Sequence, residues 1–320
     1  MSNKRNLFIG LDLGGTFLKY ALGTADGELL IKDKKPSKAD ESQDEIFNVI
    51  FETISELKEK AAEFDGQVAA IGLGSPGAVH FEECRLIGST PNIEKWTDAP
   101  IRKRVESQFE IPIWADNDAN VMAFGEARQG AAKGRKNVLC ATLGTGIGGG
   151  ILIDGELYRG THYAGSEIGH VMIVHNGRKC NCGGLGCFEQ YASAPAMVRN
   201  YKEKMQELGK TLPADIGTEF IFKQAEKDEI EAQQTIDETC DYLGTGFASL
   251  VNVFNPEMLV LGGGVAEAGE HFIEKIRKAI QEKAMNPALR GFEVAHAQLK
   301  NDAGVIGAIS MAFEEYEKAK

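Results

Sequence analysis

Two stretches of the chain share one design, and this repetition constrains the fold more than any other feature. Residues 6–15 (NLFIGLDLGG) are an apolar run that ends in two glycines, which predicts a buried strand and a tight turn. Residues 137–158 (NVLCATLGTGIGGGILIDGELY) repeat the apolar strand and the glycine turn, then continue into a hairpin around Asp154 and Gly155. The repetition indicates two related α/β halves with a cleft between them.

The rest of the pattern supports an α/β fold with two domains. We expect a smaller N-terminal α/β domain over residues 1–118 and a larger C-terminal one over residues 119–303. We expect the amphipathic helix at about 304–320 to pack back on the smaller domain. The other expected elements are a hairpin around residues 26–27, helices over 41–64, 118–130 and 187–251, and strands over 68–79, 112–117 and 257–265.

Composition excludes several functional classes. The 320 residues, with 43% hydrophobic and 26% charged side chains, are typical of a globular protein of two domains. The chain has 35 basic and 47 acidic residues, a net charge of −12, which is opposite in sign to that of a duplex nucleic-acid binder. It has no apolar run of about 18 residues and no signal-peptide pattern, so we expect a cytoplasmic protein without membrane contact.

The glycine turns predict phosphate binding. Glycine lets backbone N–H groups approach a phosphate, threonine adds a hydroxyl donor, and Asp12 offers a carboxylate to Mg²⁺. Ordinary hairpin turns are the alternative, but three such turns in one chain favour the phosphate interpretation. Neither a P-loop nor a dinucleotide fingerprint is present. The residues concerned are Asp12, Gly14, Gly15 and Thr16 in the first turn, Gly144, Thr145 and Gly146 in the second, and Gly262, Gly263 and Gly264 in the third.

A compact Cys/His motif predicts a closed metal site. Cys180, Cys182 and Cys187 follow His170 in the sequence and lie close to one another, and three thiolates with one imidazole saturate a tetrahedral Zn²⁺. Such a site has no position left for substrate, so we expect the zinc to be structural. His175 is an alternative ligand to His170. The other cysteines, Cys84, Cys140 and Cys240, are expected in the core.

Residues 114–127 (WADNDANVMAFGEA) predict a strand-to-helix junction that carries Asn117 and Asp118. Asp118 is either a helix N-cap or the general base for a substrate hydroxyl. Glu167 and His170 share one face if their segment is helical. Glu189 is either a functional carboxylate or an acidic residue that stabilises the first turn of a helix.

Together these motifs resemble a known family. Paired glycine turns after strands are similar to the nucleotide clamp of the actin, Hsp70 and hexokinase superfamily, whose fold is ribonuclease H-like with duplicated domains. D-x-G-G-T, N-D-A-N, E-x-G-H and C-x-C-G-x-x-G-C-x-E, over residues 8 to about 310, resemble the ROK family, and most of all its zinc-containing glucokinases and N-acetylhexosamine kinases. The resemblance implies ATP, Mg²⁺ and a structural Zn²⁺ as cofactors, and a dimer or tetramer.

The resemblance also implies a role for each matching residue. Asp118 would be the catalytic base, and Lys19 takes the place of the lysine that many relatives have directly after G-G-T, where this chain has Phe17. Sugar contacts would be made by Gly77, Asn92, Asn117, Asp118, Glu167, His170 and Glu189, with His170 shared between zinc and sugar.

Three functions fit a ROK protein. The first is an ATP-dependent hexose kinase, with glucose as the simplest substrate and N-acetylglucosamine or N-acetylmannosamine as alternatives. The second is a sugar-responsive repressor, disfavoured because the first strand begins at about residue 7 and leaves no room for a winged helix. The third is a non-catalytic sugar sensor, disfavoured because Asp118 and both phosphate turns are present.

Overall fold

The structure is a computed structural model that describes residues 4–90 and 93–320. Its contacts divide the chain into two compact units, which are described separately. The first unit comprises Met1–Gly134, Gly150–Ser166 and Gln298–Lys320, and the second unit comprises Arg135–Gly149 and Glu167–Ala297. The expected boundary between residues 118 and 119 stays a prediction.

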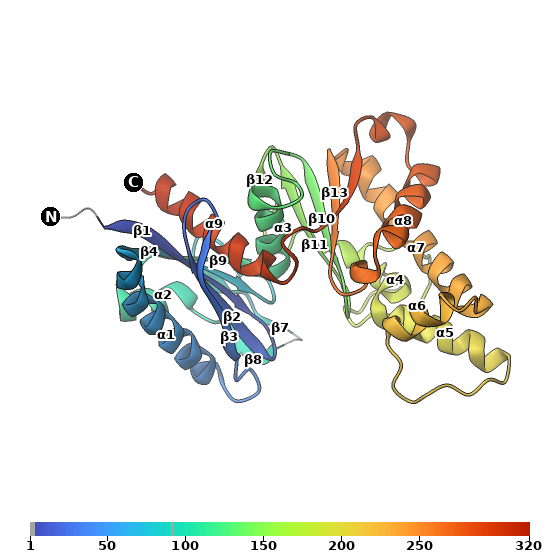
Figure 1. Ribbon diagram of the computed structural model, residues 1–320, viewed down its shortest axis with the longest axis horizontal. Coiled ribbons are helices and arrows are strands. Elements are labelled where there is room, and N and C mark those ends of the chain that lie inside the picture. The colour runs from blue at the N-terminus through green and yellow to red at the C-terminus, as the bar shows by residue number, and fades with distance from the viewer. Residues whose placement is uncertain (1–3, 91–92) are drawn as a thin grey trace. The chain divides into compact units, whose positions relative to one another are not determined.

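A five-stranded sheet in the order β3-β2-β1-β4-β9 forms the centre of the first unit (Figure 1). Strand β1 pairs antiparallel with β2 and parallel with β4, and β4 pairs parallel with β9. A turn in which Gly27 has a φ of +87° joins β2 and β3, as the Asp-Gly pair predicted. The strands are β1 (Arg5–Leu13), β2 (Phe17–Gly23), β3 (Leu29–Pro36), β4 (Gly66–Ser75) and β9 (Ile113–Asn117), and two small hairpins add β5 (Val79–His80), β6 (Arg85–Leu86), β7 (Ser89–Thr90) and β8 (Ile93–Thr97).

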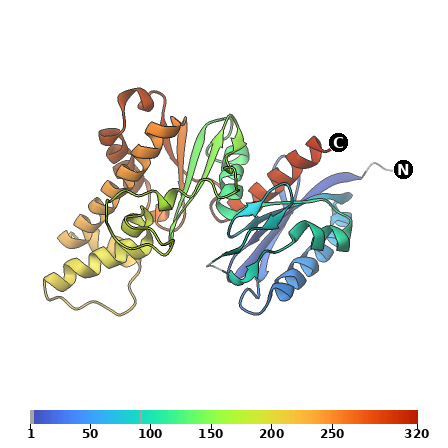
Figure 2. The same cartoon turned by 180° about the vertical axis from the view of Figure 1, so that it is seen from behind.

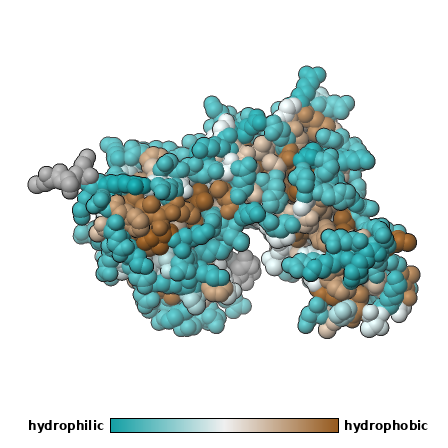
Figure 3. Space-filling model, viewed as in Figure 1, coloured by the Kyte–Doolittle hydropathy of each residue, from teal (hydrophilic) through white to brown (hydrophobic). Residues whose placement is uncertain are grey.

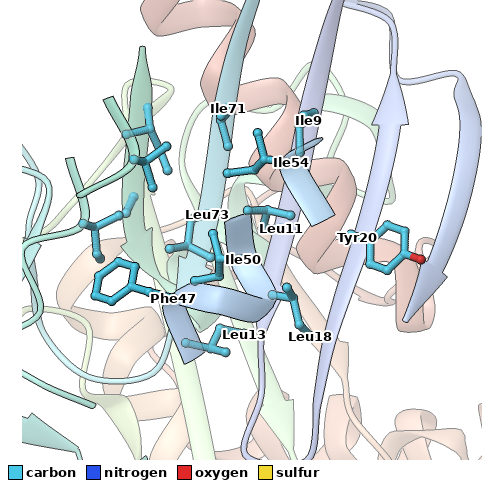
Figure 4. Packing of buried hydrophobic residues seen from close by; sticks show 14 of the residues in the cluster. Ile9, Leu11, Leu13, Leu18, Tyr20, Phe47, Ile50, Ile54, Ile71 and Leu73 are labelled. Atoms are coloured by element: carbon cyan, nitrogen blue, oxygen red, sulfur yellow. The ribbon is translucent and has the colours of Figure 1, made fainter. Parts of the chain in front are cut away.

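Helices cover both faces of this first sheet. Ile9 and Leu11 of β1 point toward α1, where they join Ile50 and Ile54 in one apolar cluster (Figure 4). Phe8 points the other way and packs with α9. Alternation of side chains along a strand accounts for this division, because both faces of a central strand are buried. The helices of the first unit are α1 (Gln43–Lys60), α2 (Ile101–Phe109), α3 (Asp118–Gln129) and α9 (Ala303–Lys318).

Helix α9 approaches the first sheet so closely that small residues are required at the contact. A Cβ on Gly72 of β4 would lie 1.9 Å from the carbonyl oxygen of Ala308. The chain reaches α9 through a segment that Glu126, a fully buried residue of α3, holds in place. The carboxylate of Glu126 accepts the N–H groups of Gln298 at 3.1 Å and Leu299 at 2.8 Å. The C-terminal helix therefore packs on the first sheet, as expected from its amphipathic pattern.

The second sheet has the order β12-β11-β10-β13-β14, and the division of the chain falls within β11. Figures 1 and 2 show that α5, α7 and α8 of the second unit gather on one side of it. The strands are β10 (Val138–Leu143), β11 (Ile147–Ile153), β12 (Glu156–Leu157), β13 (Met258–Gly262) and β14 (Glu293–His296). The helices are α4 (Glu189–Ala192), α5 (Ala194–Glu207), α6 (Thr218–Ala225), α7 (Ile230–Phe254) and α8 (Glu270–Lys283).

The segment expected to be helical over residues 187–251 consists of four helices, α4 to α7. The hydroxyl of Ser193 accepts the N–H of Ala196 and starts α5 anew, with Pro195 in its first turn. Gly209, with a φ of +67°, follows the end of α5. The periodic pattern spans all these helices because each has an apolar face toward the same core. Helices α2 and α8 and the strand β14 were not expected.

The surface and the buried cysteines agree with the composition. Polar residues cover most of the face shown in Figure 3. Within the described residues, none of the helices combines the length and apolar character needed to cross a membrane. Cys84, Cys140 and Cys240 are buried, as expected.

Candidate functional site

The carboxyl ends of β1, β4 and β9 lie next to one another in the first unit. Asp12 near the end of β1 is in register with Gly74 of β4, and Ser75 of β4 is in register with Asn117 of β9. Since these strands are parallel, their carboxyl ends meet at one edge of the sheet, where ligands of open α/β sheets bind. The structure thus brings Asp12 from the phosphate motif and Asn117 from the acceptor motif to the same edge.

Asp12 is a partly buried carboxylate with a single cation beside it. Its Oδ2 lies 3.4 Å from Nζ of Lys19, and 19% of its side chain is exposed. Burial raises the pKa of Asp12 above its usual value of 3.8, and the charge of Lys19 offsets only part of this rise. A second positive charge would therefore be favourable here, and Mg²⁺ is a cation that carboxylates bind.

The first glycine turn joins β1 and β2. The N–H of Gly14 donates to the carbonyl oxygen of Phe17 at 2.9 Å. Gly15 and Thr16 are exposed, and the carbonyl of Thr16 accepts the N–H of Ser37. The turn therefore leaves the side chain of Thr16 at the surface of the first unit.

Asn117 and Asp118 stand where β9 passes into α3. Oδ1 of Asn117 accepts the N–H groups of Ala119 at 2.9 Å and Asn120 at 3.3 Å, so Asn117 is the N-cap of α3. Asp118 is the first helical residue, and its Oδ1 also accepts the N–H of Ala119 at 2.9 Å. The sequence left open whether Asp118 is the N-cap, and in the structure the N-cap of α3 is Asn117.

Gly77 is bound to this same junction. Nδ2 of Asn117 donates to the carbonyl oxygen of Gly77 at 3.2 Å. The φ of Gly77 is +89°, and a Cβ there would meet Leu86 at 3.1 Å and Thr90 at 3.2 Å, so glycine is required. Asn92, the remaining predicted sugar contact of the first unit, lies outside the described residues.

In the second unit the second and third glycine turns lie side by side. Strands β10 and β13 are parallel neighbours, with Thr142 in register with Gly262. A Cβ on Gly263, whose φ is +86°, would lie 2.5 Å from the carbonyl oxygen of Leu143. Leu143 directly precedes the turn formed by Gly144, Thr145 and Gly146, while Gly264 has open space around its Cβ position. Two of the three predicted phosphate or nucleotide turns therefore share one edge of the second sheet.

The four predicted metal ligands form one cluster in the second unit. The donor atoms of His170, Cys180, Cys182 and Cys187 all lie within 4.8 Å of one another. Sγ of Cys180 is 3.6 Å from Nδ1 of His170, and Sγ of Cys182 is 3.6 Å from that of Cys187. A tetrahedral Zn²⁺ with Zn–S bonds of about 2.3 Å requires donors about 3.8 Å apart, so the donor set fits zinc in both chemistry and spacing.

The surroundings of the cluster also favour a cation. Burial raises the pKa of the Cys187 thiol, so the thiolates that bind zinc need a positive charge among them. His175 is not part of this set, and its Nε2 lies 3.0 Å from Nδ2 of its neighbour Asn176. Among the described residues, His170 is the histidine of the cluster.

Glu189 links the cluster to the second glycine turn. Its Oε1 lies 3.4 Å from Sγ of Cys180 and 4.0 Å from Nδ1 of His170. A Cβ on Gly146 would lie 2.7 Å from its other oxygen, Oε2. Glu189 is the first residue of α4, as the sequence allowed, but its carboxylate points at the cluster and the turn.

Glu167 and His170 lie in a single turn of 3-10 helix rather than in an α-helix. Ile168–His170 form this turn, Glu167 is its N-cap residue, and the N–H of His170 donates to the carbonyl of Glu167 at 3.1 Å. Both side chains are exposed.

Sequence reasoning missed one pair of residues near Asp118. Arg159 and Asp116 form a salt bridge of 2.6 Å, and Asp116 is 2% exposed. No spacing in the sequence relates residues 116 and 159. The one signal for this pair was an aspartate directly before N-D-A-N, at the end of a predicted buried strand.

In each of the two sheets, the central strand, β1 or β10, leads directly into a glycine turn. This arrangement defines an actin/hexokinase-like fold of two α/β domains. The chain belongs to the ROK family, whose model matches residues 8–315. This confirms the resemblance inferred from the motifs.

Relatives of known activity extend over nearly the whole chain. A glucokinase of Halalkalibacterium halodurans is 34% identical, with 94% of this chain and 93% of the relative covered. Among solved structures, a ROK family glucokinase from Streptomyces griseus in complex with glucose and AMPPNP is 32% identical, with a TM-score of 0.79 and coverage of 96% and 99%. A ROK hexokinase from Thermus thermophilus is 32% identical, with a TM-score of 0.82 and coverage of 97% and 99%.

Proposed function

We propose that this protein is an ATP-dependent glucose kinase, which transfers the γ-phosphoryl group of ATP to the 6-hydroxyl of glucose and releases glucose 6-phosphate. The observation that carries the proposal is the full-length similarity to ROK glucokinases in a chain that retains Asp118 at the β9–α3 junction. Phosphoryl transfer needs positioning, charge stabilisation and a base, and the chain has residues for each.

On the donor side, the first unit contributes Gly14, Gly15 and Thr16 to the phosphates, with Lys19 and Asp12 as charged groups. Mg²⁺ bound near Asp12 would neutralise charge on the phosphate oxygens. The Asp12 carboxylate supports this role because it is partly buried and the charge of Lys19 offsets only part of the effect of burial. The second unit contributes the turn at Gly144, Thr145 and Gly146 to the phosphates and the turn at Gly262, Gly263 and Gly264 to the adenosine.

On the acceptor side, Asp118 accepts the proton of the 6-hydroxyl as its oxygen attacks phosphorus in line with the leaving group. Asn117 holds the start of α3 and the strand end at Gly77 in a fixed geometry, so the base is positioned before substrate binds. The proposed contacts to the sugar hydroxyls are those that the ROK resemblance implies: Gly77, Asn92, Asn117, Glu167, His170 and Glu189.

The Cys/His cluster would hold a structural Zn²⁺. Four protein ligands complete its tetrahedral shell, so the metal has no open position for chemistry. Nδ1 of His170 faces the cluster. If that nitrogen held the zinc, the neutral ring would carry its hydrogen on Nε2, where it could donate to a sugar hydroxyl.

Other ROK activities are alternatives at the level of the substrate. N-acetylglucosamine or N-acetylmannosamine kinases use the same chemistry and would use the same Asp118. A non-catalytic sugar sensor is an alternative from a different functional class. A dimer or tetramer in the cytoplasm is the expected state of the protein.

A coupled assay of ADP release over a panel of sugars tests the proposal. The panel contains glucose, mannose, allose, fructose, N-acetylglucosamine and N-acetylmannosamine, with ATP as the donor. A parallel series with polyphosphate measures sugar phosphate instead, because that donor releases no ADP. We expect the highest kcat/KM for ATP with glucose. A higher kcat/KM with an N-acetylhexosamine would show that this sugar, and not glucose, is the preferred substrate. Sugar binding without ADP release would indicate a sensor instead of a kinase.

A further inference from the structure

A buried ion pair lies directly behind the β9–α3 junction. Nε of Arg159 donates to Oδ2 of Asp116 at 2.6 Å. Asp116 is 2% exposed, and the Arg159 side chain is 20% exposed. Asp116 stands two residues before Asp118. The pair is therefore close in sequence to the proposed base and nearly withdrawn from water.

The second oxygen of Asp116 holds the junction together. Oδ1 accepts the N–H of Asn117 at 2.7 Å and Nδ2 of Asn120 at 3.0 Å. These bonds join the last residues of β9 to the first turn of α3, on either side of Asp118. The direction of the Asp118 carboxylate depends on this turn, because it is the first residue of the helix.

Arg159 is itself fixed by contacts on its other sides. Its guanidinium carbon lies 3.7 Å from the centre of the Phe81 ring, a close cation–π contact. Its carbonyl oxygen accepts the N–H of Gly165 at 2.8 Å, which closes residues 159–165 into a tight loop. Tyr163 in this loop stacks on His80 with ring centres 4.3 Å apart and donates to Glu82. The loop thus presents Arg159 to Asp116 in one orientation.

The charge of Asp116 makes this arrangement depend on Arg159. A carboxylate so deeply buried is costly unless a cation pairs with it, and removing the cation leaves an uncompensated charge. In that case the Asp116 side chain is expected to turn toward water, and this movement alters the bonds of Oδ1 to Asn117 and Asn120. The proton acceptor at position 118 would then lose its fixed direction.

We propose that Arg159 is a positioning residue of the phosphoryl transfer, which acts through Asp116 on the orientation of Asp118. The proposal rests on the proposed kinase function. It assigns to the loop of residues 159–165 the task of holding the general base, although none of its side chains is required to contact sugar or ATP.

Three variants test this role in the full-length protein with ATP and its best sugar. Arg159→Met keeps the apolar stem and removes the charge. We expect its kcat to fall by about 10- to 100-fold, since small misplacements of a reacting group have effects of this size. The KM for ATP stays within about 3-fold of the wild type, because the bonds of the phosphate-binding residues are intact.

The double variant Asp116→Asn with Arg159→Gln separates positioning from direct contact. Three side-chain carbons precede Nε in arginine, and three precede the amide oxygen and nitrogen in glutamine. A neutral pair of amides can therefore replace the ion pair. Oδ1 of the new asparagine keeps its two donors. We expect kcat to return to within about 5-fold of the wild type, well above the kcat of Arg159→Met, because the junction bonds are kept and no unpaired charge is left. A double variant no faster than Arg159→Met would overturn the proposal, because it would mean that the guanidinium itself contacts substrate.

Arg128→Met is the matched control. Arg128 also lies over an aromatic ring, 4.2 Å from the centre of Phe124, and pairs with a carboxylate, that of Glu314, in the same unit. Its partner lies on α9 rather than at the junction. We expect normal kcat in this control, and equal losses in Arg128→Met and Arg159→Met would overturn the proposal. A wild type without kinase activity would instead overturn the proposed function, and the role of Arg159 in it would fall as well.

Discussion

Gly169 packs against the backbone of Ile147 so closely that a Cβ on Gly169 would lie 2.2 Å from the Ile147 carbonyl oxygen. This contact joins two motifs that are separate in the sequence. Gly169 belongs to the E-x-G-H turn, and Ile147 directly follows the second glycine turn at the start of β11. The spacing between proposed sugar ligands and proposed phosphate ligands in the second unit is therefore fixed by backbone contact rather than by side chains.

Gly169→Ala is predicted to disturb both motifs. The new Cβ overlaps a backbone atom that has no rotamer to change, so the turn must move, at a cost of about 1–3 kcal/mol in the free energy of unfolding. We expect a lower Tm and a higher KM for both sugar and ATP. Gly217→Ala is the control, because its Cβ position has no heavy atom within 4 Å and its φ is −111°. Unchanged KM values in Gly169→Ala would contradict the prediction.

The predicted metal site gives a second test. Cys180→Ser replaces one of four donors, and serine is a poor ligand for zinc. We expect the bound zinc, measured by elemental analysis, to fall well below one per chain, and the Tm to fall by about 5–10 °C because metal binding is coupled to folding. The KM for glucose should rise, since His170 and Glu189 lie against Cys180.

Cys240→Ala is the control for the metal. Cys240 is a buried thiol outside the cluster, so its removal affects packing without affecting the donor set. Zinc content should remain that of the wild type. Full zinc occupancy in Cys180→Ser would contradict the assignment of the ligands.

The sequence predicted the α/β fold, the central strands of its two sheets and the Cys/His cluster, because each rests on local chemistry. Strands such as β1 are short apolar runs, and Cys180, Cys182 and Cys187 are close along the chain. What the sequence did not predict depends on residues that meet only in the fold. Arg159 reaches Asp116, and Gly169 reaches Ile147, across separations that no periodicity or spacing encodes. The helical character of residues 187–251 was predicted, but its division into four helices was not, because the breaks depend on caps such as Ser193.

The titration of Asp12 predicts a pH-dependent change in stability. Burial raises the pKa of Asp12 in the folded protein above 3.8. An acid of this kind stabilises the folded state at pH values below its unfolded pKa, and the contribution is lost as the pH rises through the folded value. Asp12→Asn removes the titration. The variant should therefore have a higher Tm than the wild type at pH 7, and this gain should disappear near pH 4 and below.

Asp26→Asn is the control of opposite sign. A hydrogen bond from the Thr24 hydroxyl lowers the pKa of Asp26, so its ionised form stabilises the folded state above pH 3.8. That variant should have a Tm at pH 7 no higher than that of the wild type. A gain for Asp12→Asn that grows toward acid pH would contradict the sign of the shift. Thermal unfolding in the absence of nucleotide, between pH 3.5 and 8, measures both variants.

Asp118→Asn tests the general base itself. Asparagine has nearly the same shape and its Oδ1 still accepts the N–H of Ala119, so the start of α3 is preserved. It has no basic oxygen for the sugar proton, and loss of a general base lowers kcat by about 10²- to 10⁴-fold. Since the sugar contacts remain, the Kd for glucose from calorimetry should stay within about 5-fold of the wild type. The fall should therefore appear in kcat and in kcat/KM equally, as for an interaction made only in the transition state.

Asp33→Asn on β3 is the matched control, because Oδ1 of Asp33 likewise accepts the N–H of the next residue, Lys34, at 2.8 Å, in an exposed place. Its kcat should equal that of the wild type. If Asp118→Asn kept a near-normal kcat, the base would have to be another carboxylate. At this sheet edge of the first unit, Asp12 would be the next candidate, because both oxygens of the buried Asp116 already accept hydrogen bonds in the junction and from Arg159. The pair of variants therefore distinguishes a loss specific to Asp118 from a general effect of removing a carboxylate that accepts the N–H of the next residue.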